Sequence, residues 1–116
     1  YPDRTDYCRN ETAFPTYEMQ AHSAPLGLTF APDTRDLADN LIVAFHGSWN
    51  RTIPTGYKVV RIDTTSESSE TVNFITGWLD ENGDIWGRPV GVKFNEQGEL
   101  FITDDEAGAI YIMKKL

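Results

Sequence analysis

PLGLTF at residues 25–30 and PVGVKF at residues 89–94 are two copies of one strand pattern, and they decide the fold. Each copy is followed by two further runs of matching type. NLIV at 40–43 corresponds to ELFI at 99–102, and GYKVVRI at 56–62 corresponds to GAIYIMK at 108–114. The order and type of the runs are kept while the connections between them change length. The chain therefore contains an internal repeat of strand units.

The runs are rich in Val, Ile, Phe, Tyr and Leu and are separated by Gly, Asn, Asp or Pro, as strands in antiparallel sheets are. No segment has an apolar stripe at helical spacing, so the fold class is all-β. Residues 1–20 show no period and are expected to be an irregular connecting segment. The predicted strands are residues 26–30, 40–45, 56–62, 71–76, 89–94, 99–103 and 109–113.

Four antiparallel strands that recur at about 40 to 60 residues are typical of the blades of a β-propeller. Residues 21–116 then form two blades, with four strands in the first and three in the second. Two blades cannot close a ring, so the chain is expected to be the C-terminal part of a larger propeller. The exposed flanks of the two blades predict self-association of the isolated chain. A self-contained β-sandwich of seven strands is the alternative.

Composition limits the possible partners. The chain has 116 residues, 40% of them hydrophobic, and a formal net charge of −8 with scattered basic residues, which argues against nucleic-acid binding. It has no run of about 18 apolar residues that would cross a membrane. It begins with Tyr1 and no leader, as expected for a piece of a longer protein. Cys8 is either a reduced thiol or half of a disulfide to an upstream cysteine.

Five residues are candidates for binding a flat, anionic ligand. In a propeller, the loop before each innermost strand and the loop between the second and third strands lie on one face. Arg88 and His22 precede innermost strands, and His46, Trp49 and Arg51 lie between second and third strands. Each of these residues also has an alternative role that involves no ligand. The histidines could form hydrogen bonds within turns, the indole of Trp49 could pack in the core, and Arg51 could be an exposed loop residue. Arg88 lies between Gly87 and Pro89 at the entry to a strand, where a long side chain is expected to offer little to the local turn.

Two acidic segments are weaker candidates. Residues 80–84 resemble the start of a calcium loop but lack the distant bidentate Glu, so a polar turn is preferred. Residues 104–106 either line the same face as the five candidates or form a solvated hairpin tip. Zinc spacing, a glycine-rich phosphate loop and a nucleophile elbow are absent from the sequence.

The segments around these candidates resemble a known family. AHSAPLG at 21–27, HGSWNR at 46–51, GYKVV at 56–60, GRPVGV at 87–92 and the pair Asp104-Asp105 are similar to the C-terminal part of the sorbosone dehydrogenase-like sugar dehydrogenases. That family in turn resembles the soluble quinoprotein glucose dehydrogenases. These are six-bladed propellers that use pyrroloquinoline quinone and calcium to oxidise aldoses or related sugars. The resemblance covers residues 18–115.

The resemblance implies an oxidoreductase parent in the periplasm or outside the cell, with a sugar as substrate and an electron acceptor that stays open. Pyrroloquinoline quinone is flat and bears three carboxylates, so cationic side chains pair with its edge and an indole faces its rings. The general base and the calcium ligands of the family are expected outside these residues, and the isolated chain is expected to be inactive. The implied cofactor-binding residues are Arg88, His46, Trp49, Arg51 and His22.

Two other function classes stay open. A non-enzymatic propeller that binds a ligand or a protein has the same scaffold, but it has no need of cations gathered over the channel. A hydrolase of the lactonase type needs calcium-ligating Glu, Asn and Asp around the channel, and that acidic set is not evident in the sequence.

Overall fold

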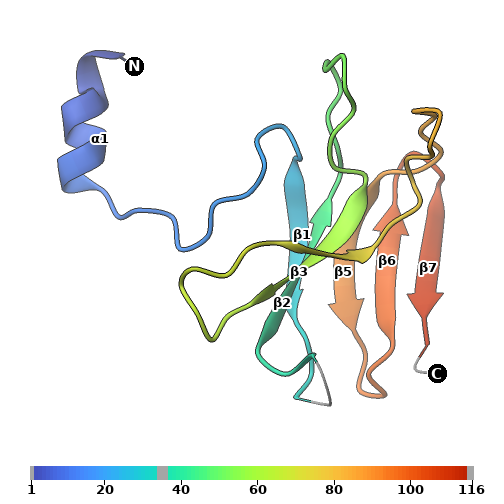
Figure 1. Ribbon diagram of the computed structural model, residues 1–116. Coiled ribbons are helices and arrows are strands. Elements are labelled where there is room, and N and C mark those ends of the chain that lie inside the picture. Colours follow the sequence, from blue (N-terminus) through green and yellow to red (C-terminus); the bar gives the residue numbers. More distant parts are fainter. Residues whose placement is uncertain (1, 34–36, 115–116) are drawn as a thin grey trace.

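The computed structural model describes residues 2–33 and 37–114 and contains two antiparallel sheets (Figure 1). The first sheet has the order β1-β2-β3-β4 and the second has the order β5-β6-β7. In each sheet, strands that follow one another in sequence are hydrogen-bonded neighbours, as in a meander. The strands are β1 (Pro25–Phe30), β2 (Asn40–Phe45), β3 (Lys58–Asp63), β4 (Val72–Ile75), β5 (Pro89–Phe94), β6 (Leu100–Asp104) and β7 (Ala109–Met113).

The all-β class and the seven predicted strands are confirmed, with differences only at strand ends. The largest difference is at β3, which was expected to begin at residue 56 and begins at Lys58. Tyr57 has a φ of 55°, which lies in the left-handed region and outside extended backbone. The strand therefore begins only after Tyr57.

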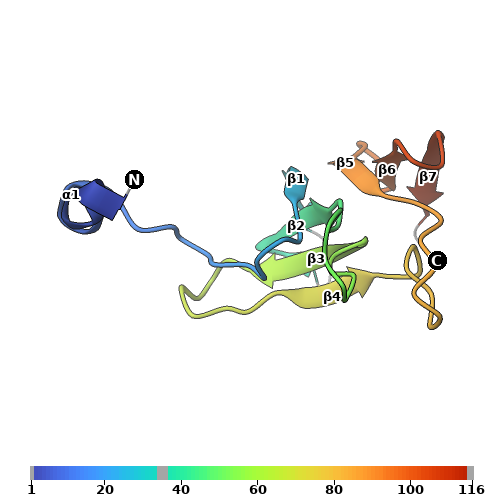
Figure 2. The ribbon, with the colours of Figure 1, turned by 90° about the horizontal axis from the view of Figure 1, so that it is seen from above.

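The two sheets meet at their first strands. A Cβ on Gly27 of β1 would lie 2.5 Å from the carbonyl oxygen of Val90 in β5, so only a glycine permits this approach. From β1 and β5 the sheets diverge toward β4 and β7 (Figure 2). Apolar side chains fill the space between them, and the buried members of this core are Ile42, Ala44, Tyr57, Val59, Trp78, Val92, Leu100 and Ile102.

Replacing Gly27 by alanine should destabilise the full-length protein by about 1 to 3 kcal/mol, because the new methyl group meets backbone and not a movable side chain. Thermal or denaturant unfolding measures the loss. Thr29→Val, in the same strand and without added volume, is the control. A Gly27→Ala protein as stable as the control would mean that β1 and β5 do not approach so closely.

The opposite face of the first sheet carries a second apolar cluster of Val43, Phe45, Val60 and Ile62. Tyr17 and Met19, from the segment before β1, pack against it. The remaining N-terminal residues lie away from the sheets (Figure 1). They form a 3₁₀ turn, Pro2–Arg4, and a short helix α1, Thr5–Glu11, that buries no residue.

The sequence predicted no regular structure before residue 20, so α1 is a difference. Residues 5–11 contain neither Gly nor Pro, and two turns are too short to show an apolar stripe. Cys8 lies on this helix with an exposed thiol. Within the described ranges, no helix is long and apolar enough to cross a membrane.

Two strands expose apolar side chains. Leu26, Leu28 and Phe30 alternate along β1 on the side away from β5, and Ile110 and Ile112 alternate along β7. Strand side chains alternate between faces, so each row lies on a single face of its sheet. No described residue of this chain buries these two rows, which is the arrangement expected of sheets with further neighbours.

Candidate functional site

The sheets bring the predicted site segments to one end of the molecule. Pro25 pairs with Phe45 in the first sheet, and Pro89 pairs with Asp104 in the second. The turn before β1 therefore adjoins the β2–β3 loop, and the start of β5 adjoins the β6–β7 turn. Hydrogen bonds from Arg88 to the β2–β3 loop and from His46 to the β6–β7 turn join the two pairs. The prediction that these segments share one face is confirmed.

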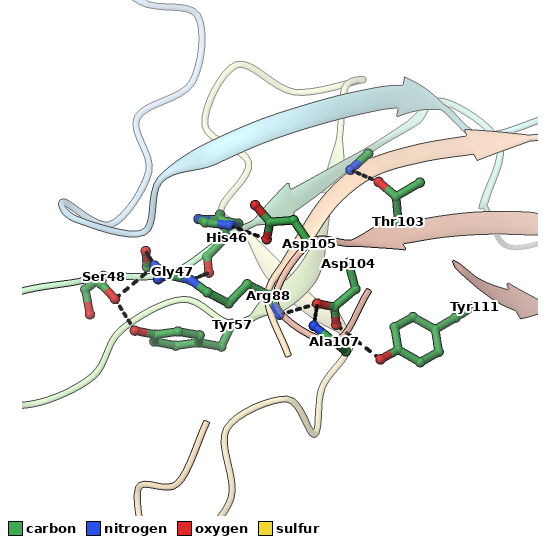
Figure 3. Close-up of polar contacts among 11 residues, drawn as sticks. His46, Gly47, Ser48, Tyr57, Arg88, Thr103, Asp104, Asp105, Ala107 and Tyr111 are labelled. Carbon is green, nitrogen blue, oxygen red and sulfur yellow. Dashed lines mark hydrogen bonds and ion pairs between the residues drawn. The ribbon is translucent and has the colours of Figure 1, made fainter. Parts of the chain in front are cut away.

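Arg88 links the two sheets at this end (Figure 3). Its Nη2 donates to the carbonyl oxygens of Gly47 at 2.8 Å and Ser48 at 3.2 Å, and its Nε donates to that of His46 at 3.3 Å. The guanidinium carbon lies 5.4 Å from the centre of the Tyr57 ring, within range of a cation–π contact. These bonds go to a loop of the neighbouring sheet and not to the turn at Arg88 itself, so the side chain has a structural role between the sheets that the sequence did not predict.

The β2–β3 loop is shaped to offer these carbonyl groups. Gly47 has a φ of 98°, and a Cβ at this position would lie 2.6 Å from the Tyr57 ring. The Tyr57 hydroxyl donates to the Ser48 carbonyl, and the Ser48 hydroxyl accepts from the Thr55 backbone N–H at 3.1 Å. The base of the loop is thus closed by its own hydrogen bonds, and its carbonyls face Arg88.

His46 makes a second contact between the sheets. Its Nε2 lies 2.9 Å from Oδ1 of Asp105, which belongs to the β6–β7 turn. The hydrogen bond from His46 lowers the pKa of the Asp105 carboxyl below its usual value, so the carboxylate is ionised at neutral pH. The described residues offer no hydrogen bond to Nδ1, the other ring nitrogen of His46.

Asp104 is buried, and its carboxylate holds the backbone at Arg88 by a hydrogen bond. Its Oδ1 accepts from the backbone N–H groups of Arg88 and Ala107, both at 2.9 Å, and its Oδ2 accepts from the Tyr111 hydroxyl at 3.1 Å. Burial raises the pKa of Tyr111, and the bond to Asp104 acts in the same direction. The Trp78 ring lies edge-on to Tyr111, with ring centres 5.7 Å apart. Asp104 thereby fixes both the start of β5 and the turn that carries Asp105.

The other three predicted residues lie at the same end without joining this network. Trp49 is 84% exposed on the β2–β3 loop, and Arg51, two residues later on the same loop, is also exposed. His22 is exposed in the turn before β1 with a φ of 66°. None of the three has a hydrogen bond, ion pair or ring contact to another described residue. The structure brings Arg88 and His46 together and leaves Trp49, Arg51 and His22 free in solvent.

Residues 80–84 form a polar turn, as preferred from the sequence. Asp80 Oδ1 accepts from the backbone N–H groups of Asn82 at 2.8 Å and Asp84 at 2.9 Å. These hydrogen bonds lower the pKa of Asp80. Across residues 2–33 and 37–114, no group of three or more His, Cys, Asp or Glu side chains is placed to hold a metal ion.

Sequence reasoning missed two supporting residues and left a third open. Tyr57 was assigned only to a strand, and no local signal in the sequence indicates its positive φ or its contacts with Ser48 and Arg88. Asp104 was grouped with two exposed acids, but its place opposite Pro89 is evident only once the β5–β6 register is known. Asp105 was left open as a hairpin tip, and its contact with His46 assigns it to the site.

Comparison with known proteins gives the family. A sequence model described as TrAA12-like matches residues 2–116. The chain belongs to the TrAA12-like family. Among solved structures, the holo form of the pyranose dehydrogenase PQQ domain from Coprinopsis cinerea is similar to this TrAA12-like chain with a TM-score of 0.76 and 30% identity, over 95% of this chain and 31% of that one. A calcium structure of Trichoderma reesei Carbohydrate-Active Enzymes Family AA12 has a TM-score of 0.71 and 26% identity, over 92% of this chain and 28% of that one.

Two curated proteins are also similar. An uncharacterized protein of Borreliella burgdorferi is 37% identical in an alignment 101 residues long, and the match covers 82% of this chain and 27% of the relative. The pyrroloquinoline quinone-dependent pyranose dehydrogenase of Coprinopsis cinerea is 32% identical in a gapped alignment 133 residues long, and the match covers 95% of this chain and 18% of the relative. The TrAA12-like chain thus spans less than a third of each of these curated relatives.

Proposed function

We propose that this TrAA12-like chain is part of a quinoprotein that oxidises a sugar with pyrroloquinoline quinone, and that it supplies cofactor-binding residues. The observation that carries the proposal is that Arg88 and His46, from different sheets, are held together at one end of the molecule. The name of the Coprinopsis cinerea relative supports the cofactor and the substrate class.

The donors at this end fit an anionic cofactor. Arg88 uses Nε and Nη2 on carbonyl oxygens, and no described residue bonds Nη1. The ring of His46 likewise has Nδ1 unbonded. A guanidinium with a free NH₂ group, and an imidazolium beside it, can each donate to a carboxylate by charge-assisted hydrogen bonds. The exposed indole of Trp49 offers a flat surface for a ring system.

The bound cofactor would accept the hydride that leaves the sugar carbon. The residues of this chain bind and orient it. Arg88, with its side chain fixed by the β2–β3 loop and by Tyr57, would hold a carboxylate in one place with little loss of side-chain entropy. His46 would bind beside it, and neither His46 nor His22 is assigned proton transfer. We place the general base and the calcium ligands in other parts of the full-length protein.

The substrate is proposed to be an aldose or a related sugar, of the glucose or sorbosone type. The two sheets diverge (Figure 2), and β1 and β7 expose rows of apolar side chains. Both features support the proposal that the chain forms two blades of a six-bladed propeller, with the other blades elsewhere in the full-length protein. A lactonase-type hydrolase is less well supported, because the similar proteins include a pyranose dehydrogenase. A binding propeller is also less well supported, because it would not need Arg88 and His46 together.

The experiment compares the full-length protein with the isolated chain, each with pyrroloquinoline quinone, calcium and an artificial electron acceptor. We expect the full-length protein to reduce the acceptor with at least one sugar of an aldose panel and the isolated chain to give only the buffer rate. A full-length protein that binds no quinone, or that hydrolyses lactones and oxidises no sugar, would overturn the proposal.

A further inference from the structure

The contact between His46 and Asp105 is a second junction between the sheets, beside the one made by Arg88 (Figure 3). His46 follows β2 in the first sheet, and Asp105 follows β6 in the second. The two residues are 59 positions apart in sequence. A contact of this kind forms only if both backbones are already in place.

Both backbones are held by other bonds. The His46 N–H donates to the Ala24 carbonyl at 3.0 Å, and the His46 carbonyl accepts from Arg88. The turn that carries Asp105 is held by Asp104, which accepts from the Ala107 N–H. The side-chain torsions of His46 are therefore its remaining freedom, and the bond from Nε2 to Asp105 removes it.

We infer that Asp105 is a positioning residue for His46: it holds the imidazole through Nε2 and leaves Nδ1 as the nitrogen that meets the ligand. The inference rests on the proposed function, because the ligand is the cofactor carboxylate. The side chain of His46 is 20% exposed and that of Asp105 is 62% exposed, so Nδ1 lies in a partly open site. The other charged groups at this point are Asp104, which is buried and bonded to backbone, and the guanidinium of Arg88.

An unrestrained imidazole loses rotamer freedom when it binds a ligand, and that loss weakens binding. A ring already fixed by Asp105 loses less. An ionised acceptor on Nε2 also keeps a proton on that nitrogen, so the ligand always meets the same side of the ring. In the complex the ring is the imidazolium, which donates from Nε2–H to Asp105 and from Nδ1–H to the cofactor carboxylate. Asp105 thus acts on binding through His46 and needs no contact of its own with the ligand.

The test uses the full-length protein and its Asp105→Ala, Asp105→Asn, His46→Ala and double Asp105→Ala/His46→Ala variants. Glu106→Ala, which removes an acid from the same turn, is the matched control. Titration of the apo proteins with pyrroloquinoline quinone gives each Kd. We expect His46→Ala to weaken binding by about tenfold and Asp105→Ala by about three- to tenfold, with the double variant no weaker than His46→Ala. Asp105→Asn keeps an acceptor oxygen and should recover part of the loss, and Glu106→Ala should bind as the wild type does.

A second measurement needs no cofactor. Histidine-selective ¹⁵N NMR of the apo protein should show a protected Nε2–H proton for His46 that disappears in Asp105→Ala, while His22 shows none in either protein. A wild-type protein that binds no quinone contradicts the proposed function, and the NMR result then decides whether Asp105 holds the His46 ring. A missing Nε2–H signal overturns the inference. Normal affinity of Asp105→Ala, or additive losses in the double variant, in a protein that does bind also overturns it.

Discussion

Arg88→Ala in the full-length protein should weaken the binding of pyrroloquinoline quinone by about tenfold to more than a hundredfold. A charge-assisted hydrogen bond to a carboxylate is worth about 1.5 to 3 kcal/mol, and each 1.4 kcal/mol is about tenfold in Kd. The same substitution should lower the free energy of unfolding by about 1 to 3 kcal/mol, because it removes the donors bonded to the carbonyls of residues 46–48.

Two variants accompany this measurement. Arg88→Lys should recover only part of the affinity, because an ammonium lacks the planar set of donors that serves loop and ligand at once. Arg9→Ala removes an arginine from the exposed helix α1 and should change neither quantity. Titration of folded apo protein gives the affinity, and denaturant unfolding gives the stability. Loss of stability with unchanged affinity would make Arg88 a structural residue only.

Asp104→Ala should destabilise the protein by about 3 to 5 kcal/mol, the largest loss of stability expected for this site. The carboxylate is 4% exposed and accepts hydrogen bonds from the Arg88 N–H, the Ala107 N–H and the Tyr111 hydroxyl. Removing it leaves these donors without their acceptor in a buried place, which costs more than the net value of the bonds. Denaturant unfolding of the full-length protein measures the loss.

Asp104→Asn is the informative partner of this variant. It keeps Oδ1 as the acceptor of both backbone N–H groups and alters only the contact with Tyr111, so it should lose less than half as much stability. Glu106→Ala, an exposed acid of the same turn, serves as the control. An Asp104→Ala protein as stable as the Glu106→Ala protein would show that the buried network does not support the site.

The strands were predictable because their signals are local. Alternating apolar residues and the turn residues between them placed β2, β5 and β7 at their observed bounds, and the repeat gave the order of the strands. The prediction that the candidate residues share one face followed from that strand order and from the geometry of propeller blades. The helix α1 was not predictable, since it is short, buries nothing and carries no apolar period.

The contacts within the site depend on how the two sheets meet, and no local pattern in the sequence indicates that arrangement. Arg88 was singled out from its place before a strand, but its bonds reach residues some 40 positions earlier in the chain. His46 was singled out without its partner Asp105, which lies in the other sheet. The direct roles of Trp49, Arg51 and His22 in cofactor binding stay predictions, as do the type of sugar and the location of the protein.

The most direct test of the account is a crystal structure of the full-length protein soaked with pyrroloquinoline quinone. The account predicts the quinone at the end of the sheets where β1 and β5 begin, with one carboxylate within hydrogen-bonding distance of the Arg88 guanidinium and of His46. A quinone bound elsewhere, in contact with neither residue, would contradict it.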